Sequence, residues 1–234
     1  MMPDMSSLPD RYSVLLIGAS GGIGSALRQI LANDRRCGEL VALSRKNDGL
    51  DITDEAAVVR SRERLAAKRF HLMICATGAL TIDGIGPEKA LRQLDPDVMA
   101  AQFRLNAIGP ALVMKHFLPL LDRSTRTISA FLSARVGSIG DNRLGGWISY
   151  RSSKAALNQI IRTASIELQR THPGAILVGI HPGTVETGLS EPFSRGHDRM
   201  SPQDAASRML NTLNAVNADE SGTFIAYDGS PILW

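Results

Sequence analysis

Short apolar runs alternate with longer amphipathic segments along most of the chain, and this alternation predicts the fold. The apolar runs, which we expect to be strands, cover residues 14–17, 40–43, 72–76, 127–134, 176–181 and 223–227. The amphipathic segments, which we expect to be helices, cover residues 23–32, 54–68, 97–121, 150–170 and 202–216. Strands that alternate with helices predict an α/β fold, with a doubly wound parallel sheet of about seven strands. Gly109-Pro110 is a candidate kink in the long third helix.

The pattern continues without a linker or repeat, so we expect a single Rossmann-type domain over residues 12–234. Residues 1–11 are polar and include Asp4 and Asp10, which predicts a flexible tail and not a signal peptide. The segment 188–200 is short and contains glycine and proline, as is typical of a mobile substrate lid. No apolar run reaches the roughly 18 residues that a membrane span requires, and we expect no membrane association.

The charge is mildly basic, with 26 Lys and Arg against 23 Asp and Glu and a net charge of +3. The densest basic stretch, residues 60–69, also contains Glu63 and apolar residues and lacks stacking aromatics. We therefore expect a solvated helix face and no nucleic-acid site. Cys37 and Cys75 form neither a disulfide framework nor a metal-binding spacing. A reducing, cytoplasmic location without a bound metal is the expectation.

A glycine-rich turn follows the first predicted strand and precedes the first predicted helix. Its residues are Gly18-Ala19-Ser20-Gly21-Gly22-Ile23-Gly24. Glycines allow a sharp turn and a close approach to a pyrophosphate, and the helix N-terminus offers free N–H groups. The spacing differs from the Gly-x-Gly-x-x-Gly of standard dinucleotide domains. A dinucleotide site is the favoured interpretation, and a turn without a ligand is the alternative.

Tyr150 and Lys154 lie four residues apart in a predicted helix, so they share one helical face. A nearby ammonium favours the phenolate and would lower the tyrosine pKa. That arrangement suits a group that transfers a proton near neutral pH. The same spacing also occurs by chance on solvated helix faces, so the pair gains weight only from the rest of the sequence.

These features together resemble the classical short-chain dehydrogenase/reductase family over nearly the whole chain. Asn106 matches the asparagine of the family's central helix, and the segment from Gly137 to Trp147 is similar to the C-factor and sniffer-type carbonyl reductase branch. The resemblance implies hydride transfer between a nicotinamide and the carbonyl carbon of a small molecule, in a homodimer or homotetramer. The cofactor-binding positions that it implies are Gly18, Ser20, Gly22, Ile23, Gly24, Asp51, Ile52, Ala76, Thr77, Gly78, Tyr150, Lys154, Pro182, Gly183, Val185 and Thr187.

The same resemblance implies the roles of the catalytic residues. Tyr150 would give a proton to the carbonyl oxygen, or remove one from an alcohol. Lys154 would lower the tyrosine pKa and bind the nicotinamide ribose, and Asn106 would hold a water that connects Lys154 to solvent.

The family's catalytic serine has no direct counterpart, because Ala134 occupies the matching position. Ser133 precedes it, and Ser138 lies in the following loop. Adjacent strand residues face opposite sides, so Ser133 can serve only if the strand has ended or twisted there. We favour Ser133, with Ser138 or neither as the alternatives. Two further departures, Ile17 for threonine and Cys75 for asparagine, affect positions that brace the sheet.

The end of the second predicted strand bears on cofactor choice. Ser44 stands where an aspartate would repel a 2′-phosphate, and Arg45 can pair with phosphate. NADP(H) is therefore favoured and NAD(H) remains possible, while Arg45 as an ordinary surface residue is the alternative. For His181, a packed side chain is favoured over one that lines the site. A dinucleotide-binding regulatory or signalling protein with little turnover is the alternative function.

Overall fold

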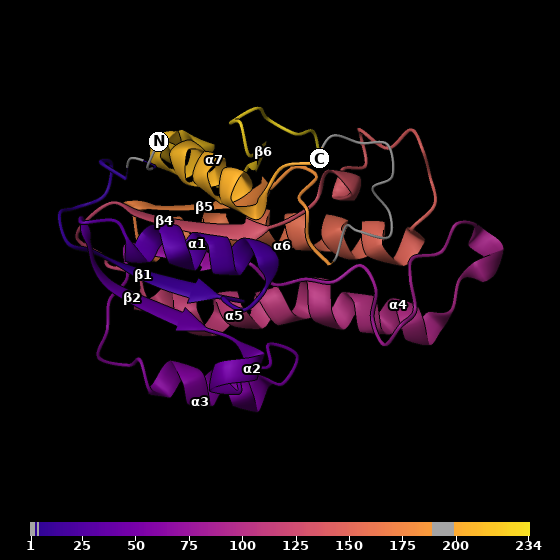
Figure 1. Ribbon diagram of the computed structural model, residues 1–234, viewed down its shortest axis with the longest axis horizontal. Coiled ribbons are helices and arrows are strands. Elements are labelled where there is room, and N and C mark those ends of the chain that lie inside the picture. The colour runs from indigo at the N-terminus through magenta and orange to yellow at the C-terminus, as the bar shows by residue number, and fades with distance from the viewer. Residues whose placement is uncertain (1–2, 4, 189–198) are drawn as a thin grey trace.

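The computed structural model describes residue 3, residues 5–188 and residues 199–234 of the chain (Figure 1). Its described strands form one six-stranded sheet in which every neighbouring pair is parallel. The order is β2 (Cys37–Leu43), β1 (Tyr12–Ile17), β3 (Leu72–Cys75), β4 (Thr127–Leu132), β5 (Ala175–His181) and β6 (Phe224–Ala226). This confirms the predicted α/β fold. The count is six strands, close to the expected seven.

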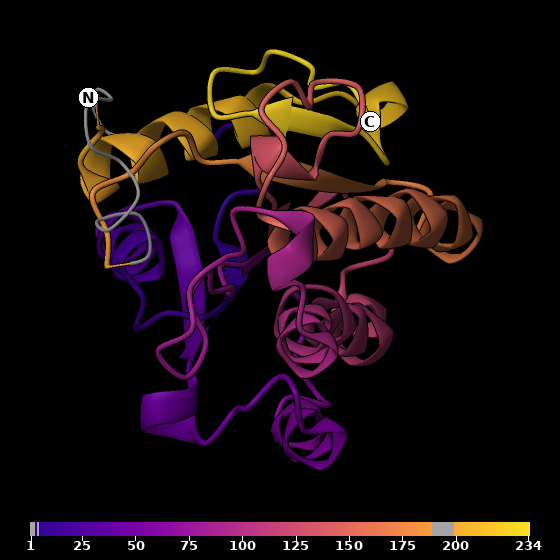
Figure 2. The same cartoon turned by 90° about the vertical axis from the view of Figure 1, so that its right-hand side faces the viewer.

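Helices cover both faces of the sheet (Figures 1 and 2). One face carries α1 (Gly22–Ala32) and α7 (Pro202–Ala215), and the other carries α3 (Glu55–Glu63), α4 (Pro96–Phe103), α5 (Gly109–Phe117) and α6 (Ile148–Thr171). The amphipathic pattern anticipated each of them. Among the described α-helices, it missed the short α2 (Arg45–Asp48).

Side chains of β1 alternate between two hydrophobic cores. Val14 and Leu16 of β1 pack with α1 and α7, whereas Leu15 and Ile17 pack with α3, α5 and α6. All four are at most 1% exposed. Burial of such a side chain stabilises the fold by about 1.5–3 kcal/mol, which explains why β1 is apolar at consecutive positions instead of alternating ones.

The long helix contains a wide turn beside the predicted kink. A π-helical segment, Arg104–Ile108, joins α4 to α5. Pro110 has no N–H to donate to the carbonyl of Asn106, so the ordinary α-helical bond cannot form at that place. The wide turn carries Asn106, which is fully buried.

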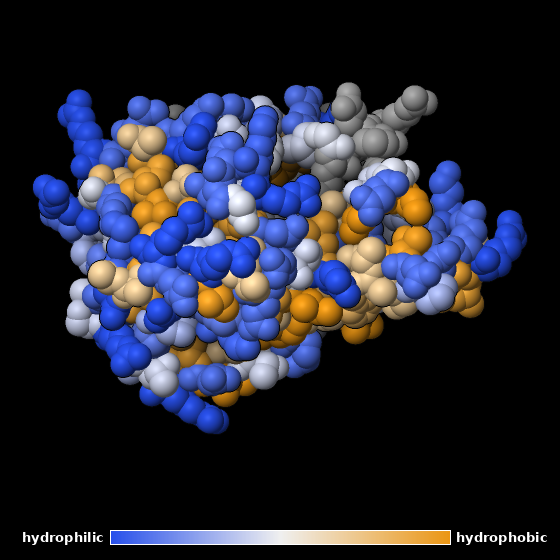
Figure 3. All heavy atoms as spheres, turned by 90° about the horizontal axis from the view of Figure 1, so that it is seen from below, coloured by the Kyte–Doolittle hydropathy of each residue, from blue (hydrophilic) through white to orange (hydrophobic). Residues whose placement is uncertain are grey.

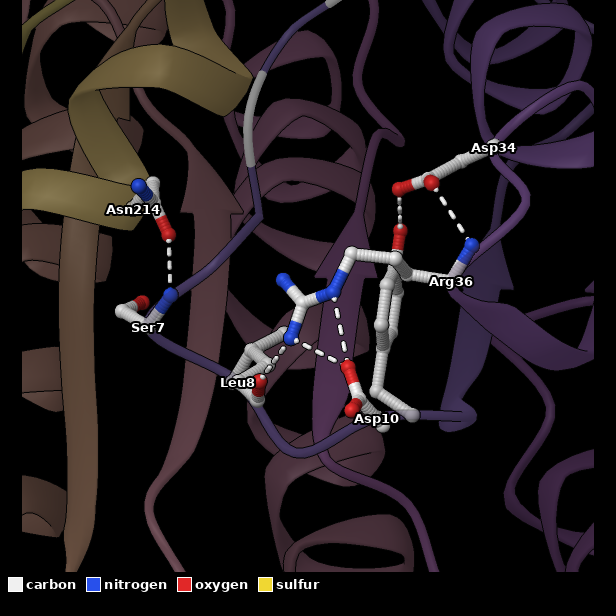
Figure 4. Close-up of polar contacts among 7 residues, drawn as sticks. Ser7, Leu8, Asp10, Asp34, Arg36 and Asn214 are labelled. Carbon is white, nitrogen blue, oxygen red and sulfur yellow. Dashed lines mark hydrogen bonds and ion pairs between the residues drawn. The ribbon is translucent and has the colours of Figure 1, made fainter.

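The expectation of a flexible tail over residues 1–11 is wrong for residues 5–11. Met5 and Leu8 are buried against the core between α1 and α7, at 1% and 2% exposure. The Ser7 amide donates to Asn214 Oδ1 of α7 at 2.8 Å, and Arg36 Nη2 donates to the Leu8 carbonyl at 2.8 Å (Figure 4). The two apolar side chains within this polar stretch explain the packing.

The surface of the described residues is mixed. Figure 3 shows hydrophilic residues over much of one face, with groups of hydrophobic residues between them. In the described part of the chain, no helix is long and apolar enough to cross a membrane.

Candidate active site

The sheet reverses its strand order at β1, because β2 lies on one side of β1 and β3 on the other. In doubly wound sheets, ligands bind at the carboxyl ends of the strands beside such a reversal. A cavity of about 700 Å³ lies at these ends. Its walls come from the turn after β1, the ends of β3, β4 and β5, and the first turns of α6.

Twelve of the predicted site residues line this cavity: Gly22, Ile23, Ala76, Thr77, Gly78, Ser133, Tyr150, Lys154, Pro182, Gly183, Val185 and Thr187. Gly18 and Gly24 shape the turn behind it, and Asn106 lies behind Gly78. The structure does not place the remaining five, Ser20, Ser44, Arg45, Asp51 and Ile52, in the cavity wall. Most of the candidate site is therefore brought together, and the group expected at the adenosine end is not part of this cavity.

The glycine turn is tight because its backbone folds back on itself. Gly18 has a φ of +87°, and its amide donates to the Leu43 carbonyl at 2.9 Å. A Cβ at Gly24 would overlap the Gly18 carbonyl oxygen, and one at Gly22 would lie 2.7 Å from Thr187 Cγ2. No side chain caps the N-terminus of α1, so its first N–H groups are available to an anion.

Lys154 is buried without a carboxylate partner among the described residues. Its Nζ donates to the Leu132 carbonyl at 3.0 Å. Burial disfavours the charged ammonium and lowers the pKa of Lys154 to about 8. A Cβ at Gly78 would lie 3.2 Å from Nζ, and one at Gly137 would lie 2.7 Å from Lys154 Cβ. The two glycines thus leave the space that the lysine side chain occupies.

Tyr150 is 6% exposed and lines the cavity beside Lys154. Lys154 Nζ lies 5.9 Å from the centroid of its ring. Burial raises the pKa of Tyr150 above its ordinary value, so the expected lowering by Lys154 is wrong for the protein alone. The lysine ammonium points to the Leu132 carbonyl, and loss of hydration of the phenolate dominates. Tyr150 is therefore a neutral phenol at physiological pH.

Asn106 braces the chain after β3. Its Nδ2 donates to the Ala79 carbonyl at 2.9 Å and to Gln102 Oε1 at 2.7 Å, while its Oδ1 accepts from the Ala79 amide at 3.1 Å. These bonds use both amide hydrogens. The side chain thereby fixes the loop that follows Gly78 at the wall of the cavity.

The structure separates the two serines that could replace the missing catalytic one. Strand β4 ends at Leu132, and Ser133, just beyond it, lines the cavity and donates from Oγ to Asn158 Oδ1 at 2.6 Å. Ser138 Oγ accepts from the Asp141 amide at 3.0 Å and does not line the cavity. The buried Nδ2 of Asn158 has no hydrogen-bond partner among the described residues.

The end of β2 forms a capped turn. Ser44 Oγ accepts from the Asn47 amide at 3.2 Å, and the Ser44 amide donates to Asp48 Oδ2 at 2.8 Å. The side chain of Arg45 is 80% exposed, with Nη1 4.0 Å from Asp51 Oδ2. Hydrogen bonds from Thr53 lower the pKa of Asp51. A largely exposed guanidinium, paired at long range with Asp51, therefore stands at this edge of the molecule.

Several lining residues were not predicted from the sequence: Leu80, Arg135, Val136, Asp141, Arg143, Leu144, Trp147 and Arg151. Arg151 directly follows Tyr150, and four of the others lie in the segment from Gly137 to Trp147 that carries the branch resemblance, but neither signal placed them at the cavity. His181 also lines the cavity, against the favoured interpretation of a packed residue. Burial, with Arg135 nearby, lowers the pKa of His181 to about 4, so this histidine is neutral at pH 7.

The two bracing substitutions lie in packed surroundings. Ile17 is 1% exposed within the core, and Cys75 Sγ lies 3.2 Å from Thr77 Oγ1. Burial raises the pKa of the Cys75 thiol. No group of three potential metal ligands occurs in the part of the chain that the structure describes.

The predicted lid over residues 188–200 lies largely outside the described residues, including Phe193 and Arg195. The chain on its two sides is held together. The Met200 amide donates to the Thr184 carbonyl at 2.9 Å, and the Glu186 amide donates to the Met200 carbonyl at 2.9 Å.

Comparison with known proteins agrees with this geometry. The family model for short chain dehydrogenases matches residues 13–198. The chain is 30% identical to 1-hydroxy-2-glutathionyl-2-methyl-3-butene dehydrogenase of Rhodococcus sp. (strain AD45), over 95% of this chain and 99% of that protein. It is 34% identical to the C-signal of Myxococcus xanthus, over 62% of this chain and 84% of that protein.

Among solved structures, the NADPH-bound carbonyl reductase from chicken fatty liver superposes with a TM-score of 0.77. The two are 26% identical, and the match covers 98% of this chain and 97% of that chain. The C-signal match and this neighbour confirm the resemblance to the C-factor and carbonyl reductase branch. The fold, the glycine turn and the family match together establish that this chain belongs to the short-chain dehydrogenase/reductase family.

Proposed function

We propose that this protein is an NADPH-dependent reductase of a small carbonyl compound, with Tyr150 as the proton donor. The observation that carries the proposal is the buried, neutral Tyr150 phenol beside Lys154 at the wall of the cavity. A bound reduced nicotinamide would supply the hydride for the carbonyl carbon, and Tyr150 would give its proton to the carbonyl oxygen. Because burial keeps Tyr150 protonated, the free protein is prepared for reduction more than for alcohol oxidation.

The residues present fit a dinucleotide. At Gly18, Gly22 and Gly24 the turn leaves no room for a side chain, and the start of α1 offers uncapped N–H groups. Gly183 and Thr187 lie across from this turn in the same cavity. Lys154, which has no carboxylate partner in the described part of the chain, would bind the ribose hydroxyls.

The preference for NADPH over NADH rests on the edge of the sheet after β2. The side chain of Arg45 is 80% exposed and its ion pair with Asp51 is long, at 4.0 Å, so it would be able to meet a 2′-phosphate. The Asp48 carboxylate, which lies near the same strand end, acts against this preference. The carbonyl reductase from chicken fatty liver is bound to NADPH, which supports the same choice.

Ser133 is our candidate for holding the substrate oxygen. As its hydrogen bond stands, Ser133 donates to Asn158, and the buried Nδ2 of Asn158 is unpaired. A buried N–H without a partner is costlier than a carbonyl oxygen without one. A half-turn of the amide would let Nδ2 donate to Ser133 Oγ, which would free the serine hydroxyl to donate into the cavity. Asn106, whose side chain is occupied, would hold a water only through its backbone carbonyl.

The decisive experiment compares wild type with Tyr150→Phe. NADPH oxidation is followed against a panel of aldehydes, ketones and quinones, and NADP reduction against the matching alcohols. We expect the variant to lose at least about 100-fold in kcat, which is typical of a missing general acid, while NADPH still binds. Equal rates in the two proteins would overturn the proposal. The C-signal relative keeps a signalling role as the second candidate, and cofactor binding without turnover on any substrate would favour it.

A further inference from the structure

Three arginines line the outer part of the cavity, and only one of them is paired with a carboxylate. Arg135, Arg143 and Arg151 all come from the chain between β4 and the start of α6. Arg135 Nη1 lies 3.3 Å from Asp141 Oδ2. Neither Arg143 nor Arg151 has an ion pair with any residue that the structure describes. Two guanidinium charges at the cavity thus have no carboxylate partner among the described residues.

Arg151 is held in place without being neutralised. Its Nε donates to the Gly146 carbonyl at 2.9 Å, and its Nη1 donates to the Val136 carbonyl at 3.2 Å. Its Nη2 has no hydrogen-bond partner in the described part of the chain. Two backbone carbonyls therefore orient a full positive charge and leave one nitrogen to donate elsewhere.

The segment that carries Arg143 is anchored at several points. The Gly140 amide donates to the Trp234 carbonyl at 2.8 Å, and the Trp147 amide donates to the Glu88 carbonyl at 2.5 Å. The Gly145 amide donates to Asn142 Oδ1 at 3.0 Å. These bonds fix the segment on both sides of Arg143, which consequently remains at the cavity wall.

The rest of the wall around these arginines is apolar or already assigned. Its apolar members are Leu80, Leu132, Val136, Leu144 and Trp147. Asp141 is paired with Arg135, and His181 is neutral at pH 7. Lys154 lies deeper, against Leu132. An apolar wall with two free guanidinium groups suits a molecule that has an apolar body and one negative end.

We propose that the substrate is a carbonyl compound that carries a carboxylate, and that Arg143 and Arg151 bind this carboxylate while the carbonyl group reaches Tyr150. The inference rests on the proposed reductase function and specifies its substrate class. A guanidinium donates two parallel N–H bonds to a carboxylate, and such charge-assisted bonds are about twice as strong as neutral ones. The other charged or titratable groups do not compete for this role, because Arg135 is paired with Asp141, His181 is neutral at pH 7 and Lys154 lies deeper.

The test uses a matched pair of substrates, terephthalaldehydic acid and its methyl ester, with NADPH. They share the aldehyde and the ring and differ in the charge at the far end. In wild type we expect kcat/KM for the acid to exceed that for the ester by about tenfold or more. Arg143→Met and Arg151→Met should each reduce this ratio, and the double variant should bring it close to one. Arg170→Met removes a charge from the exposed far end of α6 and should leave the ratio unchanged.

Other results would overturn the substrate class. If wild type reduces both compounds with equal efficiency, the reductase function stands and the carboxylate preference is wrong. If the ratio is high but survives in Arg143→Met, which alters only an exposed side chain, the assigned arginines are wrong. If neither compound is reduced, the affinities of the two corresponding alcohols for the NADP-loaded protein are measured by calorimetry and compared. A preference for the acid that the double variant loses would support the site, and equal binding would overturn it.

Discussion

Asn158 links the candidate substrate serine to the helix of the catalytic pair. It lies on α6 one turn beyond Lys154, and its amide contacts Ser133 at the end of β4. A serine that holds a substrate oxygen must have its hydroxyl hydrogen pointed into the cavity, and Asn158 is the neighbour that can fix this orientation. We regard it as a positioning residue that acts only through Ser133.

A double-mutant cycle tests this dependence. We expect Asn158→Leu and Ser133→Ala each to lower kcat about tenfold, because Ser133→Ala removes the donor to the substrate oxygen and Asn158→Leu leaves that donor without a fixed orientation. The double variant should be no slower than Ser133→Ala alone, with the KM for NADPH unchanged in all three. Independent effects that multiply in the double variant would indicate that Asn158 supports the fold instead.

The protonation of Lys154 sets an upper pH limit for cofactor binding and activity. Burial lowers the pKa of Lys154 to about 8, so its ammonium is charged below that pH and neutral above it. Binding of ribose hydroxyls and stabilisation of the developing alkoxide both need the charged form. We expect kcat/KM for NADPH, which reports the free enzyme, to fall about tenfold per pH unit above roughly pH 8.

Lys154→Arg provides the control for this profile, because a guanidinium stays protonated throughout the range. Its activity will be lower, but the decline near pH 8 should be absent. If the decline persists in Lys154→Arg, another group is responsible.

At the scale of elements, the start of α1 is more sensitive to an added side chain at Gly24 than at Gly21. A Cβ at Gly24 would overlap the Gly18 carbonyl oxygen, whereas a Cβ at Gly21 would lie 3.6 Å from the same atom, an ordinary contact. Gly21 also has a φ of −74° that alanine adopts freely. Gly24→Ala should therefore lower the free energy of unfolding by about 1–3 kcal/mol.

Gly21→Ala is the matched control and should change that free energy by less than about 1 kcal/mol. Urea unfolding of both variants and wild type measures the difference. Equal loss in the two variants would show that any side chain disturbs this turn, and that the packing of Gly24 against Gly18 is not the cause.

The helices and strands could be predicted because their signals are local. Consecutive buried positions in β1 and the periodic apolar faces of α1 and α7 are visible in the sequence. The cavity wall could not be predicted in the same way. Arg143 and Trp147 lie on an irregular segment whose path is fixed by Glu88 and Trp234, residues distant in the chain. The N-terminal segment was mistaken for the same reason, since only α7 explains why Met5 and Leu8 are buried.

At the scale of the whole molecule, the side of α5 and α6 away from the sheet is a candidate interface between copies. A groove of about 350 Å³ runs between them, with Met114 and Ile160 among its lining residues. Ile108 and Ile166 on the same helical layer are 52% and 45% exposed. Isolated exposed apolar residues are common, but a groove beside them suits association. We accordingly expect the homodimer or homotetramer that the family resemblance implied.

Light scattering coupled to size-exclusion chromatography measures the assembly. Wild type should elute at a multiple of the 25.2 kDa chain mass. Ala164→Arg places a charge in the groove and should shift the protein toward monomer. Gln29→Arg adds the same charge on exposed α1, on the opposite face of the sheet, and should not. A monomeric wild type at micromolar concentration would contradict the expectation.

The all-parallel sheet also determines the order in which the molecule can assemble. Parallel neighbours cannot be joined by a short hairpin, so each strand meets its partner only after a crossover of a dozen or more residues is ordered. Closing these loops lowers the conformational entropy of the chain before the stabilising strand contacts can form. β1 pairs with β3 across the intervening β2 and α3, and the cavity needs the ends of β4 and β5 as well. The site is consequently a late product of folding, absent from any partly folded form that lacks the second half of the sheet.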